Sequence, residues 1–313
     1  MTQDRPVLGM FLMVLFCILA PLGDAMAKIL GGTIPLVQLV MIRFAIQAIV
    51  LIPMAYATKR PMALSSRVMG FAWLRVVLHI IGLAAMFSAL QYLPLADAIA
   101  IAFVMPFLLL LAGYLWMNEQ VGPHRLWACV VGFIGVTLVI QPSFQQVGYA
   151  ALLPVIVAVA FSGFILTTRH IAQETDPISL QAVNGVMAIA VLIPLWAIAS
   201  ALTDMPVFDV VWPNAIQWSE MAIWGVIGTA AHLVMTWSLR YAPSATLAPI
   251  QYLEIPIATI FGWLIFGDLP NGLAAIGIAV TIAAGLYIIH REHSMASQSK
   301  SQANTDPTAR AAE

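Results

Sequence analysis

The sequence predicts an all-α membrane protein with ten transmembrane helices, arranged as two inverted five-helix repeats. Hydrophobic residues fill 62% of the 313 positions and charged residues only 9%, whereas a soluble domain carries about 25% charged residues. Apolar stretches of about 20 residues, the length that crosses a bilayer as a helix, recur along the chain. Features of the first half of the chain return in the second half.

The apolar stretches indicate helices, because the strands of a membrane barrel are about 9–11 residues long and alternate in polarity. We expect the ten spans at residues 8–29, 35–57, 70–92, 95–117, 125–141, 149–169, 178–201, 220–240, 244–266 and 272–290.

The internal repeat is clearest in two short stretches. The stretch SALQYLPLADA runs from Ser88 to Ala98, and SLRYAPSATLA runs from Ser238 to Ala248. Each places a Tyr two residues before a Pro, followed by small residues. We therefore divide the chain into a cytoplasmic N-terminus (1–7), a first repeat (8–141), a second repeat (149–290) and a disordered cytoplasmic tail (291–313).

An odd number of spans in each repeat makes the second copy enter the membrane from the opposite side. Inverted repeats are typical of secondary transporters, whose substrate site lies between the halves near the middle of the bilayer. Proline residues gather in the fourth and ninth spans, which are equivalent in the two copies, and should kink them beside a cavity. These prolines are Pro94, Pro106, Pro243, Pro249 and Pro256.

The order of these features resembles the EamA-type branch of the drug/metabolite transporter superfamily. The resemblance is carried by the proline-bearing fourth span, by Trp116-Met117-Asn118-Glu119-Gln120 after it, and by Gly132-Phe133-Ile134-Gly135-Val136 in the fifth span. The stretches Ala20–Ala25 and Leu93–Ala98 also resemble bacterial riboflavin transporters of that branch. The resemblance implies carriage of a small organic metabolite.

Charged residues inside the spans indicate a structural or functional role, because placing one at mid-membrane costs about 2.5–3.5 kcal/mol. Asp24 and Lys28 are four residues apart on one helix face and could pair. Arg43 in the second span could also reach Asp24. Two interpretations of Arg43 stay open, a structural ion pair with Asp24 or contact with an anionic group of the substrate.

Further polar and aromatic residues at similar depth are candidates for substrate binding or ion coupling. They are Gln47, Gln181, Asn184, His232, Trp237, Gln251, Tyr252 and Glu254. A carboxyl group in a low-dielectric site can bind a proton near neutral pH, so Glu254 is the best candidate for proton coupling, with His232 as its alternative. A structural or substrate-contact role for Glu254 stays open.

The sequence offers no pattern of a metal or cofactor site, and no enzyme motif such as H-E-x-x-H or G-x-S-x-G. The expected partners are the lipid bilayer and a small-molecule substrate, and no nucleic acid. Ala275, Ala279 and Ala283 form a stripe of small residues in the tenth span, with Ala128 and Gly132 in the fifth. Such stripes let helices approach closely and could pack the halves together or form a homodimer.

These observations favour a secondary transporter of a small organic metabolite in the bacterial inner membrane. The most specific hypothesis, riboflavin uptake, is what the resemblance alone implies. The alternative within this class is a proton-coupled exporter of amino acids or other metabolites. The distant alternative is a membrane-embedded enzyme.

Positive charge predicts the orientation of the chain. The Lys and Arg residues of the loops fall at the termini and in or beside the even-numbered loops: Arg5, Lys59, Arg60, Arg67, Arg75, Arg125, Arg169, Arg240, Arg291, Lys300 and Arg310. Since loops rich in Lys and Arg stay in the cytoplasm, both termini should be cytoplasmic.

Cysteine labelling in intact cells tests this topology. A cysteine at Pro206, in the acidic loop near 202–219, should react with an impermeant thiol reagent, and a cysteine at Ser66 should not. Labelling at Ser66 alone would reverse the orientation.

Overall fold

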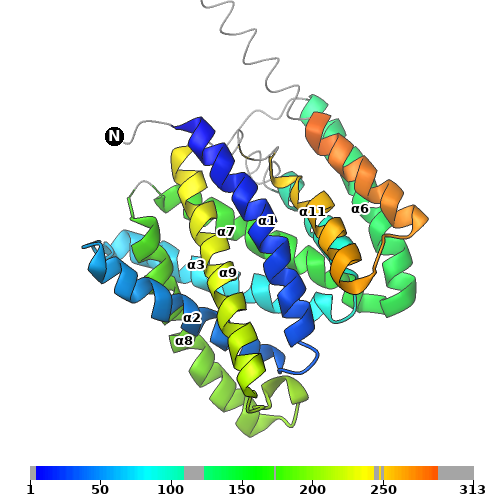
Figure 1. Ribbon diagram of the computed structural model, residues 1–313. Helices are drawn as coiled ribbons and strands as arrows, with labels where there is room; N and C mark the ends of the chain where they lie inside the picture. The colour runs from blue at the N-terminus through cyan, green and yellow to red at the C-terminus, as the bar shows by residue number, and fades with distance from the viewer. Residues whose placement is uncertain (1–4, 109–122, 173, 243–246, 248–249, 288–313) are drawn as a thin grey trace, which may run out of the picture.

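The computed structural model describes residues 5–108, 123–172, 174–242, 247 and 250–287, and this part of the chain is helical with no β-strand. Six segments are long and apolar enough to cross a membrane, and three shorter apolar helices accompany them. The predicted all-helical membrane fold is confirmed. Figure 1 shows α1, α9 and α11 on the near face and α6 at one edge.

The helices follow the expected apolar stretches closely. Their bounds are α1 Pro6–Leu30, α2 Leu36–Ala57, α3 Ser66–Leu90, α4 Leu95–Ala102, α6 Pro123–Val147, α7 Leu153–Ile171, α8 Pro177–Leu202, α9 Ala215–Tyr241 and α11 Glu254–Phe261. A 3₁₀ turn, Gly148–Leu152, joins α6 to α7; another, Pro206–Phe208, follows α8; and a π-helical turn, Gly262–Phe266, extends α11. The last described helix is Gly272–Tyr287.

Side chains cap the helices that start outside the apolar stretches. Asp176 accepts hydrogen bonds from the backbone N–H groups of Ile178 and Ser179 at the start of α8. Asn214 and Gln217 form a capping box at the start of α9. These caps satisfy N–H groups that have no partner within the helix.

The fourth and ninth spans are interrupted at equivalent positions. The helix that starts at Leu95 breaks at Phe103 and Val104 and resumes at Met105, while residues 252 and 253 break the chain immediately before α11. Pro106 and Pro256 follow the two breaks, and each lacks the N–H group that a continuous helix would need. The predicted interruption of both spans is therefore confirmed.

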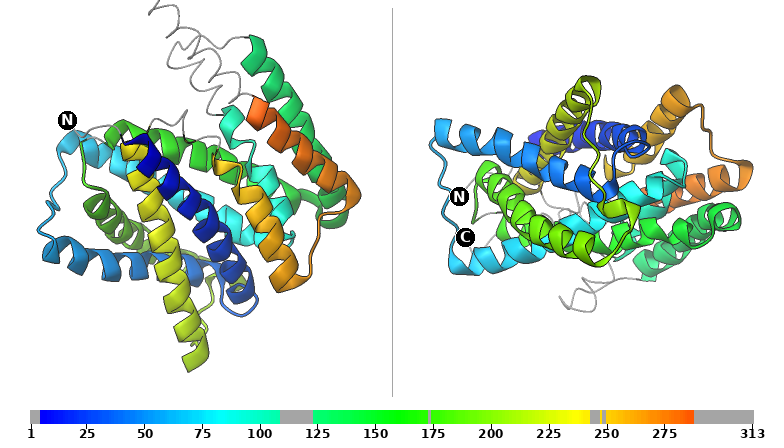
Figure 2. Two further views of the ribbon diagram at one scale, coloured as in Figure 1. Left: turned by 45° about the horizontal axis from the view of Figure 1, so that its top comes forward. Right: turned by 90° about the horizontal axis from the view of Figure 1, so that it is seen from below.

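The two halves of the chain pack against each other along their length. α1 lies along α9, α3 along α7, and α2 along α8, and the first of these pairs is plain in Figure 1 and in the left view of Figure 2. If α1 exchanges with α7, α2 with α8, α3 with α9 and α4 with α11, the first two contacts exchange with each other and the contact of α2 with α8 maps onto itself. The same exchange maps the contact of α1 with α11 onto that of α7 with α4.

The helices α6 and Gly272–Tyr287 pack together at one edge of the molecule, as both views of Figure 2 show. They approach so closely that a Cβ atom at Gly135 would lie 2.9 Å from the carbonyl oxygen of Gly277. By contrast, Ala275, Ala279 and Ala283 are exposed. The expectation that these alanines pack the halves together is wrong, and a role in a homodimer stays a prediction.

Several predicted features lie outside the described residues. These are the stretch from Trp116 to Gln120, Pro243, Pro249, the end of the tenth span and the tail 291–313.

Candidate functional site

A cavity lies between the two halves, beside the breaks in the fourth and ninth spans. Its lining comes from α1, α2, α3, α4, α7, α9 and α11. Phe103 and Met105 line it at the first break, and Gln251 and Glu254 line it at the second. The broken spans therefore border a cavity, as the mirrored prolines predict.

Most of the cavity wall is apolar and aromatic. Five rings line it, those of Phe16, Phe87, Phe103, Phe161 and Trp224, together with three methionine side chains. The indole N–H of Trp224 donates to the carbonyl oxygen of Gly23 at 2.9 Å, which fixes this ring against α1. Large rings with few polar partners suit a flat, mostly apolar ligand.

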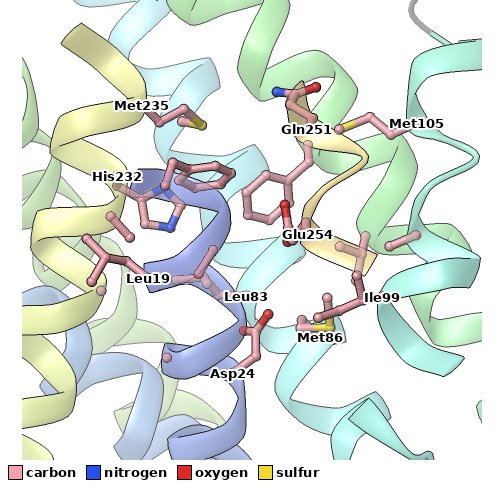
Figure 3. A pocket seen from close by; sticks show the side chains of 18 of the residues that line it. Leu19, Asp24, Leu83, Met86, Ile99, Met105, His232, Met235, Gln251 and Glu254 are labelled. Carbon is pink, nitrogen blue, oxygen red and sulfur yellow. The ribbon is translucent and has the colours of Figure 1, made fainter. Parts of the chain in front are cut away.

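Five polar side chains interrupt the apolar wall: Asp24, Arg43, His232, Gln251 and Glu254. Figure 3 shows Asp24, Glu254 and Gln251 following one another along the cavity, with His232 on the other side. Asp24 interacts electrostatically with both Arg43 and Glu254. Four of the predicted binding or coupling candidates thus meet here, together with Asp24.

Arg43 reaches the cavity from α2 and is only 2% exposed. Its Nη1 donates to Gln47 Oε1 and to Thr229 Oγ1, both at 3.3 Å. Its Nη2 has no hydrogen-bond partner among the described residues. The guanidinium lies against Gly228, where a Cβ atom would collide with it. Glycine at this position of α9 is what allows the Arg43 guanidinium to lie against the helix beside the cavity.

Gln47 and Gln181 form a second layer behind the cavity. Gln47 Nε2 donates to Gln181 Oε1 at 3.1 Å, and Gln181 Nε2 donates to Thr236 Oγ1 at 2.9 Å and to the His232 carbonyl oxygen at 3.0 Å. Neither glutamine lines the cavity. They connect α2, α8 and α9, and so position Arg43 and His232.

A pair of histidines joins the equivalent helices α3 and α9. The Nε2 atoms of His79 and His232 are 3.4 Å apart, and the side-chain nitrogen of Asn184 lies 3.3 Å from His79 Nδ1. Asn184 does not line the cavity, so it too acts behind the lining. The Nδ1 atom of His232 has no partner in the described structure.

Lys28 does not pair with Asp24. Its ammonium lies 3.5 Å from Asp268 Oδ2, donates to the Leu93 carbonyl oxygen at 2.9 Å and sits over the ring of Phe266. The expected pair within α1 is wrong, because the loop after α11 supplies a nearer carboxylate. Among the described residues, Arg43 and Asp24 form no ion pair within 4.0 Å, although both line the cavity.

The two predicted aromatic contacts lie outside the cavity lining. Trp237 stacks on Tyr241, with ring centroids 5.5 Å apart, and lies near the guanidinium of Arg240. Tyr252 packs on Phe103 at 5.3 Å and rests against Gly285 of the last helix. Tyr252 therefore supports Phe103, which does line the cavity.

Sequence reasoning missed two buried ionisable residues. The sequence groups Arg75 with the Lys and Arg residues in or beside the loops, but its side chain is fully buried. Its Nε donates to Thr168 Oγ1 at 2.7 Å, and its guanidinium lies over the ring of Phe164. Its place one turn before His79 on a single helix face could have revealed it. Asp97 is also buried and accepts a hydrogen bond from Ser143 Oγ at 3.3 Å.

Comparison with known proteins gives a consistent family. The model of the EamA-like transporter family matches twice, at residues 7–141 and 148–290. A riboflavin transporter of Brucella anthropi is 28% identical over 230 residues, which is 74% of this chain and 80% of the relative. A riboflavin transporter of Rhizobium johnstonii is 30% identical over 218 residues, 70% of this chain and 69% of the relative.

A more distant relative is named for a different substrate and for export. The pseudopaline exporter of Pseudomonas aeruginosa is 24% identical and covers 92% of this chain and 96% of its own. One solved crystal structure shares the fold, with a TM-score of 0.63, 18% identity and coverage of 93% of this chain and 98% of the other.

The layer behind the cavity can be tested by Gln181→Leu. The substitution removes both hydrogen bonds that Gln181 Nε2 donates to α9 and leaves buried partners unsatisfied. This should lower the free energy of unfolding by about 1–3 kcal/mol. We expect a lower midpoint of thermal unfolding in detergent. Gln145→Leu is the control, because Gln145 on α6 is exposed and makes no hydrogen bond in the described structure. Equal midpoints for the two variants would contradict this role of Gln181.

Proposed function

The chain belongs to the EamA-like transporter family, and from this premise we propose that it is a secondary transporter that takes up riboflavin across the bacterial inner membrane. The observation that carries the proposal is the cavity between the two halves, with an aromatic wall and few polar groups. A flat ring system with a polar edge fits such a wall. The riboflavin transporters among the relatives support this substrate.

We place the chain in the membrane as ten helices in two inverted repeats of five. Counted as separate spans, α6 and α7 join the other long helices and the three shorter apolar ones to make ten. The helix contacts between the two halves are unchanged as a set when each helix of one half is exchanged with its counterpart, α1 with α7 and α3 with α9, and this supports two equivalent halves. With both termini in the cytoplasm, each half would enter the bilayer from the opposite side.

Alternating access requires contacts between the halves that open and close at each end. At one end, Arg60 lies 2.9 Å from Asp176, and Arg67 lies 3.5 Å from Glu174. At the other end, Lys28 lies 3.5 Å from Asp268. In each pair at least one side chain is exposed, and surface ion pairs contribute about 0–1 kcal/mol each, so breaking these three pairs adds little to the cost of opening either end.

The second candidate function is a proton-coupled exporter of another metabolite. It is favoured by the full-length similarity to the pseudopaline exporter and by Glu254, an acidic side chain that faces the cavity from a broken helix. A carboxyl group there can be uncharged while the cavity is closed and ionised when water enters, so its protonation could favour one face of the transporter. The two candidates differ in the direction of net transport.

Growth of a riboflavin auxotroph tests the proposed function. Cells that cannot make riboflavin and lack their own carrier should grow at low external riboflavin when they express this protein, because the carrier replaces the missing uptake route. The same cells with an empty vector should not grow. Failure to grow, with the protein shown by immunoblot to be in the membrane fraction, would contradict riboflavin uptake and favour the exporter.

A further inference from the structure

The polar groups of the cavity are unusual because most of them have no partner. In the part of the chain that the structure describes, the side chains of Asp24, Glu254 and Gln251 make no hydrogen bond. Arg43 Nη2 and His232 Nδ1 are buried and also without a partner. Polar groups held unpaired in a low-dielectric site favour any ligand that supplies the missing hydrogen bonds.

These groups specify what the ligand must offer. Arg43 is a donor and requires an acceptor on the ligand, such as a ring carbonyl oxygen. The carboxyl groups of Asp24 and Glu254 accept hydrogen bonds when ionised and therefore favour hydroxyl or ring N–H donors. The aromatic wall provides surfaces for a flat ring. The cavity thus matches a planar ring with acceptors and a chain of hydroxyl groups.

The charges of the cavity disfavour an anionic ligand. One guanidinium, that of Arg43, faces two carboxyl groups, those of Asp24 and Glu254. When both carboxyl groups are ionised, these three groups carry one positive and two negative charges, so a phosphate group finds no surplus positive charge and removal of either carboxyl group weakens its repulsion. A buried anion without a compensating cation is strongly unfavourable.

Apart from the titratable ring of His232, no other side chain that can carry a positive charge lines the cavity among the described residues. Lys28 is engaged by Asp268 and by the Leu93 carbonyl oxygen, and it does not line the cavity. Arg75 is held by Thr168 and also lies outside the lining. The charged and titratable side chains that line the cavity among the described residues are therefore Arg43, Asp24, Glu254 and His232.

We propose that the cavity binds its substrate as an uncharged, planar ring compound with a hydroxyl-bearing chain, and that Asp24 and Glu254 exclude the phosphorylated form of that compound. The inference rests on the proposed function. For riboflavin it means that flavin mononucleotide, which differs by one phosphate group on the chain, is rejected. Asp24 and Glu254 are thus specificity-determining residues of the transport site.

Competition in proteoliposomes tests the exclusion. The full chain is reconstituted, uptake of radiolabelled riboflavin is measured, and unlabelled riboflavin or flavin mononucleotide is added as competitor. We expect flavin mononucleotide to compete at least twentyfold more weakly than riboflavin. Riboflavin uptake with equal competition by the two flavins would overturn this inference alone. Absence of riboflavin uptake would overturn the proposed function and this inference with it.

Substitutions test the assignment to the two carboxyl groups. Asp24→Asn and Glu254→Gln keep the shape of the side chains and remove the negative charge. Each should therefore reduce the ratio of the inhibitory concentrations of flavin mononucleotide and riboflavin by about fivefold or more. Asp97→Asn is the matched control, because Asp97 is a buried acid outside the cavity lining, and its selectivity should equal that of the unaltered chain.

Competition for riboflavin uptake is compared only among variants that elute as a single species in detergent. If one of the two variants does not fold, the other decides the assignment. Selectivity that is unchanged in the folded variants, or changed equally by Asp97→Asn, would overturn the role of Asp24 and Glu254.

Discussion

The architecture depends on one constraint, namely that backbone polar groups inside a bilayer must find partners within the protein. A polar side chain from the other half of the chain lies beside each of the breaks in the fourth and ninth spans. Cys17 Sγ of α1 lies 3.3 Å from the Ile250 carbonyl oxygen. Ser162 Oγ of α7, which donates to the Ala158 carbonyl oxygen at 2.7 Å, lies 3.4 Å from the Met105 carbonyl oxygen. Breaks that need such partners cannot face lipid, so they meet at the cavity between the halves.

The same arrangement explains why polar residues gather where they do. A guanidinium in an apolar interior needs several acceptors, and Arg43 obtains two of them, from α2 and α9. Gln47, Gln181 and Asn184 hold α2, α8 and α9 together around it and around the histidine pair. The binding groups therefore sit on helices that are joined to one another by buried hydrogen bonds.

The sequence predicts the membrane class, the repeats and the paired interruptions, because apolar length and proline position are local properties. It also identifies Arg43, His232, Gln251 and Glu254, since polar residues deep in apolar spans are rare. It fails for Lys28 and Arg75, whose partners, Asp268 and Thr168, are 240 and 93 positions away. Spacing along one helix shows which residues share a face, but not which other helix covers that face. The placement of Gln47 and Gln181 behind the cavity rather than in it has the same cause.

The central claim is that this cavity is the substrate site. Riboflavin binding to the purified protein, followed by quenching of flavin fluorescence, tests it most directly when the cavity is filled by Ala20→Trp. Ala197→Trp, on the exposed side of α8, is the control. We expect the unaltered protein and Ala197→Trp to quench flavin fluorescence, and we expect folded Ala20→Trp not to quench it. Undiminished binding by Ala20→Trp would contradict it.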